Sequence, residues 1–176
     1  MREKESGKKK RMVDVENIGS DREIDYKLDV TSDLDWPLNG IVIIIDPGMS
    51  CKDRLINSLI SKTKDRANHL KWPLGKEDGL LEEIVSNLRN LYAMEEKQAA
   101  IMILDGFPLE TPEDERFKEF KSMILEARAQ NVGIWFVDRT MRNIPAWLEC
   151  IADVVLIPTE QVGAFVFGKK SRKQGQ

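Results

Sequence analysis

The sequence is poor in the residues on which most metal sites and disulfide frameworks depend. Its 176 residues include two cysteines and a single histidine. With His69 as the only histidine, a zinc site built from cysteine and histidine ligands and a histidine-based catalytic triad are both excluded. Cys51 and Cys150 are too few for a disulfide framework, which favours a reducing compartment, and we therefore expect a cytoplasmic protein.

The chain also lacks a hydrophobic run of the roughly 18–20 residues that a membrane span requires. Its first residues are basic but lead into no apolar segment, so we expect neither a secretory signal nor a membrane span. Hydrophobic residues make up 41% of the chain and charged residues 32%. This balance is typical of a soluble globular domain with a highly charged surface.

Positive charge is concentrated at the two ends. The net charge of −3 excludes a uniformly basic nucleic-acid-binding protein. Residues 1–12, however, hold six basic and two acidic side chains, and residues 169–173 hold four basic ones. These tails are either solubilising segments or contacts for nucleic-acid phosphates, and DNA is the partner we consider. We expect a flexible N-terminal segment at 1–36, one domain at 37–168 and a basic tail at 169–176.

Continuous apolar runs indicate the buried strands of a parallel sheet. Residues 41–45 are five consecutive β-branched residues, as expected for a strand buried on both faces. Similar runs occur at 99–104 and 134–137, and helical patterns separate them. Further elements are expected as helices at 53–70, 80–94, 113–130 and 144–151, a hairpin of strands at 154–157 and 164–167, and a short edge strand near 24–30. This order predicts a three-layer α/β fold, with a mostly parallel sheet, helices on both faces and an antiparallel edge hairpin.

The segment after the first of these strands has the position and length of a phosphate-binding P-loop, or Walker A motif. In such a loop, backbone N–H groups and a helix N-terminus surround a phosphate, and a lysine reaches its oxygens. Lys52 occupies the position of that lysine. The candidate nucleotide-binding residues are Asp46, Pro47, Gly48, Met49, Ser50, Cys51, Lys52 and Asp53. An ordinary strand-to-helix turn with a surface lysine is the alternative.

This loop departs from the GxxxxGK[ST] pattern at three positions. Asp46 and Cys51 replace the two glycines, and Asp53 replaces the serine or threonine. The Asp53 carboxylate could still hold Mg²⁺, but two acids close to a triphosphate repel it.

Asp105 ends the second buried strand, as a Walker B aspartate does when it orders Mg²⁺. Because the carboxyl ends of parallel strands share one edge, we expect Lys52 and Asp105 side by side there. The candidate metal ligands are Asp53 and Asp105. The candidate catalytic residues are Asp105 and Arg139. Arg139 follows the third strand and could act as an arginine finger or sensor; the alternative is an arginine in a surface salt bridge. Gly106 stands where hydrolytic enzymes usually place a glutamate.

Residues 40–157 resemble the FtsK/HerA-like ATPases, which pump DNA in translocation, conjugation and genome packaging. Besides the loop and the aspartate strand, the resemblance rests on a helix ending in Arg128, a strand ending at Asp138, an Ile-Pro pair at 144–145 and an Ala-Asp pair at 152–153. It implies a RecA-like P-loop NTPase that binds ATP and Mg²⁺ and works as a homo-oligomeric ring or within a larger motor assembly. Asp138 replaces the family's usual glutamine, which implies weakened or lost hydrolysis.

A second resemblance concerns residues 104–108 alone. Their sequence, Leu-Asp-Gly-Phe-Pro, is similar to the LDGFPR motif of adenylate and nucleoside monophosphate kinases, but Leu109 replaces the arginine. Three hypotheses therefore remain open: an ATPase-family motor subunit, a nucleoside monophosphate kinase-like enzyme, and a catalytically dead P-loop relic that serves as an assembly module.

Overall fold

The computed structural model describes residues 22–29, 39–48, 50–72, 80–95, 99–106, 115–160 and 163–169. Strands and helices alternate along most of this part of the chain. The strands are β1 (Arg22–Asp29), β2 (Ile41–Ile45), β3 (Asn68–Trp72), β4 (Ala100–Asp105), β5 (Val132–Asp138), β6 (Val154–Pro158) and β7 (Gly163–Lys169). The helices are α1 (Lys52–Thr63), α2 (Leu80–Ala93), α3 (Glu115–Glu126) and α4 (Ala146–Ile151), with a 3₁₀ turn at Met141–Asn143. None of the described helices is long and apolar enough to cross a membrane.

All seven strands form one sheet in the order β1-β7-β6-β2-β5-β4-β3. The five strands β6, β2, β5, β4 and β3 are parallel. β2 is the middle strand of the seven and pairs with β5 on one side and β6 on the other. β7 runs antiparallel to both β6 and β1. The edge strand expected near 24–30 is therefore present as β1, and it occupies the sheet edge outside the β6–β7 pair.

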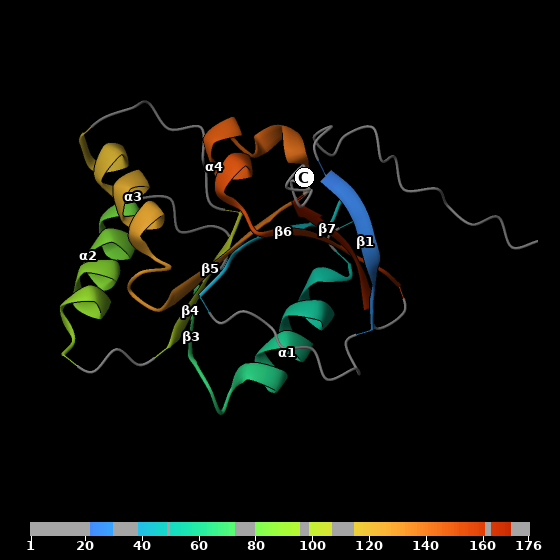
Figure 1. The fold of residues 1–176 in the computed structure, drawn as a ribbon, viewed down its shortest axis with the longest axis horizontal. Coiled ribbons are helices and arrows are strands. Elements are labelled where there is room, and N and C mark those ends of the chain that lie inside the picture. Colours follow the sequence, from blue (N-terminus) through green and yellow to red (C-terminus); the bar gives the residue numbers. More distant parts are fainter. Residues whose placement is uncertain are drawn as a thin grey trace, which may run out of the picture.

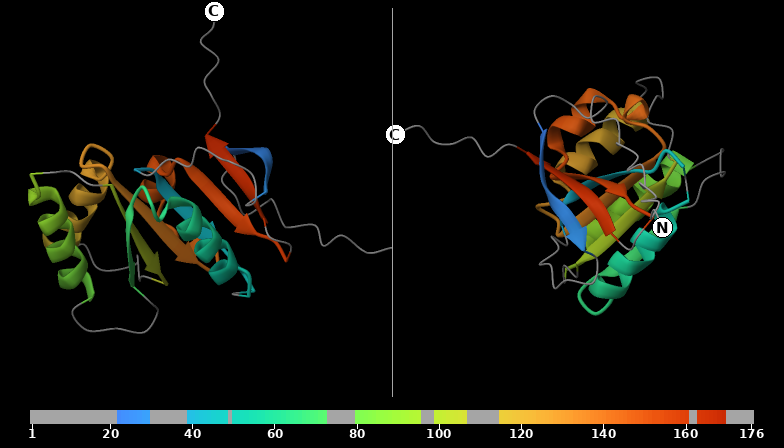
Figure 2. Two further views of the ribbon diagram at one scale, coloured as in Figure 1. Left: turned by 90° about the horizontal axis from the view of Figure 1, so that it is seen from below. Right: turned by 90° about the vertical axis from the view of Figure 1, so that its right-hand side faces the viewer.

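Helices cover both faces of the sheet, as the sequence predicts (Figures 1 and 2). Alternate residues of β2 point to opposite sides: Ile43 packs with the residues of α2, α3 and α4, and Ile44 packs with α1. All five residues of β2 and all six of β4 are buried. Burial on both faces is what makes these segments continuous apolar runs. The outcome is a three-layer α/β domain with the carboxyl ends of five parallel strands along one edge.

The prediction of one helix over 53–70 is wrong, because α1 ends at Thr63 and a strand follows. The Thr63 hydroxyl donates to the Leu59 carbonyl, and the Thr63 carbonyl accepts from the backbone N–H groups of Arg66 and Ala67, which turns the chain. Residues 68–72 then pair with β4 as β3. This strand lies at the edge of the sheet and mixes polar with apolar residues, so it lacks the apolar run that identifies the central strands.

Candidate functional site

The predicted neighbours Lys52 and Asp105 lie side by side at the carboxyl edge of the sheet. Lys52 is the first residue of α1, directly after the loop that follows β2, and Asp105 is the last residue of β4. The Lys52 ammonium group lies 2.7 and 2.6 Å from the two carboxylate oxygens of Asp105. Since β5 separates β2 from β4, the lysine spans the end of β5. The predicted adjacency is thus confirmed.

This ion pair is buried. The side chains of Lys52 and Asp105 are only 8% and 6% exposed. Removing two charges from water is costly, and it is tolerated where the charges satisfy each other with good geometry. The positive charge of Lys52 is therefore already neutralised inside the protein, by the residue that we predicted to bind Mg²⁺.

Asp46, the first residue of the loop, directs its carboxylate back to the start of α1. One of its oxygens accepts hydrogen bonds from the backbone N–H groups of Cys51 and Lys52, at 2.8 and 2.7 Å. Asp46 is only 5% exposed. Cys51, the N-cap residue, offers no side-chain cap of its own, so Asp46 caps the helix from five residues upstream. A negative charge is favourable there because the helix dipole is positive at its N-terminus.

The other predicted loop residues lie closer to solvent. Pro47, Gly48 and Ser50 are exposed, and Cys51 is half-buried. The Ser50 hydroxyl lies 3.6 Å from the Cys51 sulfur atom. Met49 lies outside the described residues.

The two predicted metal ligands have separate cationic partners. Asp53 is exposed, and its carboxylate lies 3.5 Å from the Lys71 ammonium group on β3. Asp105 instead binds Lys52. Within the described part of the chain, no three or more His, Cys, Asp and Glu residues form a group that could hold a metal ion. A Mg²⁺ ion at this edge would therefore have to compete with these lysines for the carboxylates.

Gly106 adopts a backbone conformation that explains why no glutamate follows Asp105. Its φ angle is +68°, in the left-handed region, and its N–H donates to the Val137 carbonyl at 2.8 Å. A residue with a side chain is strained at such a φ angle. The turn that leaves β4 therefore favours glycine.

Asp138, at the position of the expected glutamine sensor, organises the loop after β5. Its Oδ1 atom accepts from the backbone N–H groups of Arg139 and Thr140, at 2.6 and 3.1 Å, and from the Asn143 side chain at 2.9 Å. Its backbone carbonyl accepts from the Asp46 N–H at 3.0 Å, which ties the two loops together. The Arg139 side chain is exposed beside them. The sequence pattern did not predict this role, although Asp followed by Thr and Asn is a typical loop-capping combination.

Arg128 and Asp153 belong to the same resemblance, and they meet at the amino ends of the parallel strands, opposite the carboxyl ends. They form an ion pair, and the second carboxylate oxygen of Asp153 accepts the N–H of Ile41 at 2.8 Å. Arg128 therefore lies at the amino ends of the parallel strands, away from the Lys52 of its own chain.

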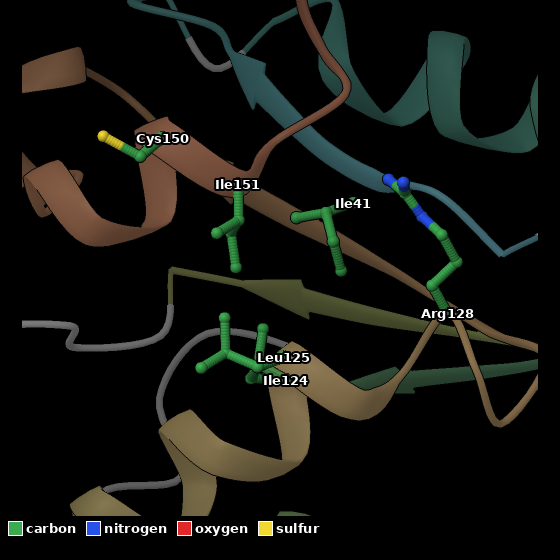
Figure 3. A pocket seen from close by; sticks show the side chains of 6 residues that line it. All are labelled: Ile41, Ile124, Leu125, Arg128, Cys150 and Ile151. Carbon is green, nitrogen blue, oxygen red and sulfur yellow. The ribbon is translucent and has the colours of Figure 1, made fainter.

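Arg128 also borders a cavity of about 300 Å³ between α3 and α4 (Figure 3). The cavity is lined by Ile41, Ile124, Leu125, Arg128, Cys150 and Ile151.

The fold and this edge define an α/β domain with a parallel five-stranded core and a loop between β2 and α1 that leads to the buried Lys52. No family model matches the chain, and no curated protein sequence matches it. Among solved structures, it is similar to the cytoplasmic domain of the type VII secretion ATPase EccC of Thermomonospora curvata, with a TM-score of 0.49 and 8% sequence identity. The match covers 80% of this chain but 25% of that one. This likeness concerns the arrangement of helices and strands alone.

Proposed function

We propose that the chain is a P-loop ATPase-family domain that binds ATP weakly and does not hydrolyse it, and that it serves as a non-catalytic subunit of a larger assembly. The observation that carries this proposal is the buried contact between Lys52 and Asp105, at 2.6 Å. A lysine after a buried strand and an aspartate at the end of a second one are the two charged groups of a nucleotide–Mg²⁺ site. Their meeting across β5 supports that ancestry over an ordinary turn with a surface lysine.

Three features support the absence of turnover. Gly106 supplies no carboxylate to orient water, and its positive φ angle disfavours a replacement. Asp138 accepts three hydrogen bonds at one oxygen and holds its own loop. Lys52 is neutralised by Asp105. Loss of a single preorganised group that stabilises a transition state typically lowers kcat by about 100- to 1,000-fold, so the combined loss removes useful hydrolysis.

The larger assembly that we propose is a DNA-translocating motor, because the sequence resembles DNA-pumping ATPases. Arg139 is exposed at the carboxyl edge and is the residue we propose for contact with a neighbouring subunit's nucleotide. Residues 1–12 and 169–173 supply the basic charge that we propose for DNA contact; except for Lys169, which ends β7, they lie outside the described residues. The kinase hypothesis has less support, since it rests on residues 104–108 alone and Leu109 replaces the arginine that ends the motif. Residues 107–109 lie outside the described part of the chain.

The test is a calorimetric titration of the full chain with ATP, ADP and AMP, with and without Mg²⁺, combined with a phosphate-release assay. We expect weak, saturable ATP binding and no steady-state hydrolysis. Absence of ATP binding in every condition would refute nucleotide binding. Transfer of phosphate from ATP to a nucleoside monophosphate, detected by ³¹P NMR, would instead establish the kinase hypothesis.

A further inference from the structure

We propose that Asp46 is a built-in competitor for phosphate, so that an anionic ligand reaches the start of α1 only by displacing the Asp46 carboxylate. This inference rests on the proposed function, because it concerns the control of the same site. It assigns to Asp46 a regulatory contact rather than a role in binding the ligand.

The geometry shows an anion position that is already filled. The two amides that Asp46 engages, those of Cys51 and Lys52, stand at the N-terminus of a 12-residue helix. Backbone N–H groups at this place in a strand–loop–helix unit are the ones that bind phosphate oxygens in a P-loop. Both bonds are charge-assisted and shorter than a typical amide hydrogen bond, and the carboxylate that accepts them is buried.

The charges point the same way. Asp46, Lys52 and Asp105 are buried together at the carboxyl edge, and they sum to one negative charge. Because Asp105 neutralises Lys52, the Asp46 carboxylate stands as the excess charge that a phosphate would meet. Two negative groups in a poorly hydrated site repel strongly, so phosphate and carboxylate exclude each other there.

Displacement of Asp46 requires a movement of its side chain. Its backbone N–H is held by the Asp138 carbonyl at 3.0 Å, so the end of β2 is fixed on that side. The next two residues, Pro47 and Gly48, are exposed, whereas Asp46 itself is buried. The Asp46 carboxylate and a bound anion are therefore mutually exclusive at the Cys51 and Lys52 amides.

The experiment compares the full chain with two variants of Asp46. Asp46→Gly removes the carboxylate and restores the glycine of the P-loop pattern, and Asp46→Asn keeps the shape but not the charge. Asp65→Asn is the matched control, since exposed Asp65 follows the far end of α1, about 18 Å away at 1.5 Å per residue. Inorganic pyrophosphate and Mg²⁺-ATP are the probes, titrated calorimetrically, with the Cys51 and Lys52 amide resonances followed by NMR.

We expect Asp46→Gly to bind pyrophosphate at least about tenfold more tightly than the unaltered chain, a difference of about 1.4 kcal/mol. Asp46→Asn should gain less, and Asp65→Asn should behave as the unaltered chain does. The Cys51 and Lys52 resonances should shift on binding. Asp46→Asn keeps the comparison valid should Asp46→Gly fail to fold.

Equal pyrophosphate affinity in the unaltered chain and the Asp46 variants, including no binding by any of them, would overturn the inference. A gain for pyrophosphate without any ATP binding would support the inference and refute the proposed nucleotide function. ATP binding by the unaltered chain as tight as that of Asp46→Gly would support the proposed nucleotide function and refute the inference about Asp46.

Discussion

Lys52 and Asp105 are 53 positions apart in the chain and belong to strand–loop units that are not neighbours in the sheet, yet their charged groups lie 2.6 Å apart in the protein interior. A nucleotide site would need both charges available to phosphate and Mg²⁺. Here they satisfy each other, and the consequences of that arrangement can be measured.

Removing one partner of this ion pair should destabilise the protein more than replacing both partners by apolar residues. Lys52→Met or Asp105→Leu alone leaves one buried charge without its partner, and each should lower the free energy of unfolding by about 3–5 kcal/mol. The double variant should be clearly more stable than the sum of the two single losses implies, because no unpaired charge remains. Urea unfolding of the four proteins measures the coupling; additive effects would show that the pair is not energetically coupled.

Gly106 should resist replacement by the glutamate of a hydrolytic site. With φ at +68°, Gly106→Glu should lower the free energy of unfolding by about 1–2 kcal/mol. It should also fail to restore ATP hydrolysis, since Lys52 and Asp46 remain engaged. Thermal unfolding and phosphate release are the measurements. A Gly106→Glu protein that is fully stable and turns over ATP would show that this single position had silenced the site.

His69 should make stability depend on pH. The Thr63 hydroxyl donates to the Leu59 carbonyl, so it accepts from the His69 Nε2–H, 2.8 Å away. Burial lowers the pKa of His69 below its usual value of 6.5. The folded protein therefore binds this proton less readily than the unfolded chain does. The stability from this group is full above about pH 6.5 and is lost as the pH falls below that value towards the folded pKa.

The measurement for His69 is urea unfolding between pH 8 and 5 on the unaltered chain and on His69→Gln. Carboxylates titrate in both proteins, so the difference between them isolates the histidine. We expect the unaltered chain to lose more stability than the variant between about pH 6.5 and 5. Parallel pH profiles would contradict the expectation.

The two basic ends should provide salt-dependent contact with DNA. Replacing Lys8, Lys9, Lys10, Lys170, Arg172 and Lys173 by glutamine alters neither a described strand nor a described helix. We expect weak, sequence-independent binding by the unaltered chain that falls steeply with salt, because phosphate contacts release counterions. A gel-shift series in increasing salt should show binding by the unaltered chain and its loss in the variant. Unchanged binding would place any DNA contact elsewhere.

The parts of the structure that the sequence predicts are those that depend on buried apolar runs. β2, β4 and β5 are buried on both faces, and their positions bring Lys52 and Asp105 to one edge. β3 was missed because an edge strand needs only partial burial and pairs through its backbone, which any residue provides. The predicted helix extended too far for a related reason: without an apolar run to mark β3, His69 and Leu70 also fit a helical pattern.

The roles of individual polar residues were harder to predict. From the sequence, Asp46 was interpreted as a departure from a phosphate-binding loop, whereas its carboxylate caps α1. Asp138 looked like a lost sensor, whereas it holds three donors of its own loop. Whether a carboxylate binds its own backbone or a ligand depends on loop geometry of a few ångströms, and residue types alone do not determine that.

The central claim is that this edge of the sheet keeps the charged groups of an ATPase but has lost its turnover. Phosphate release from Mg²⁺-ATP by the full chain, measured beside Lys52→Ala, tests it most directly. We predict release at the rate of the buffer for both proteins. Steady-state hydrolysis by the full chain that Lys52→Ala abolishes would contradict the account, because it would show that Lys52 leaves Asp105 and acts on nucleotide.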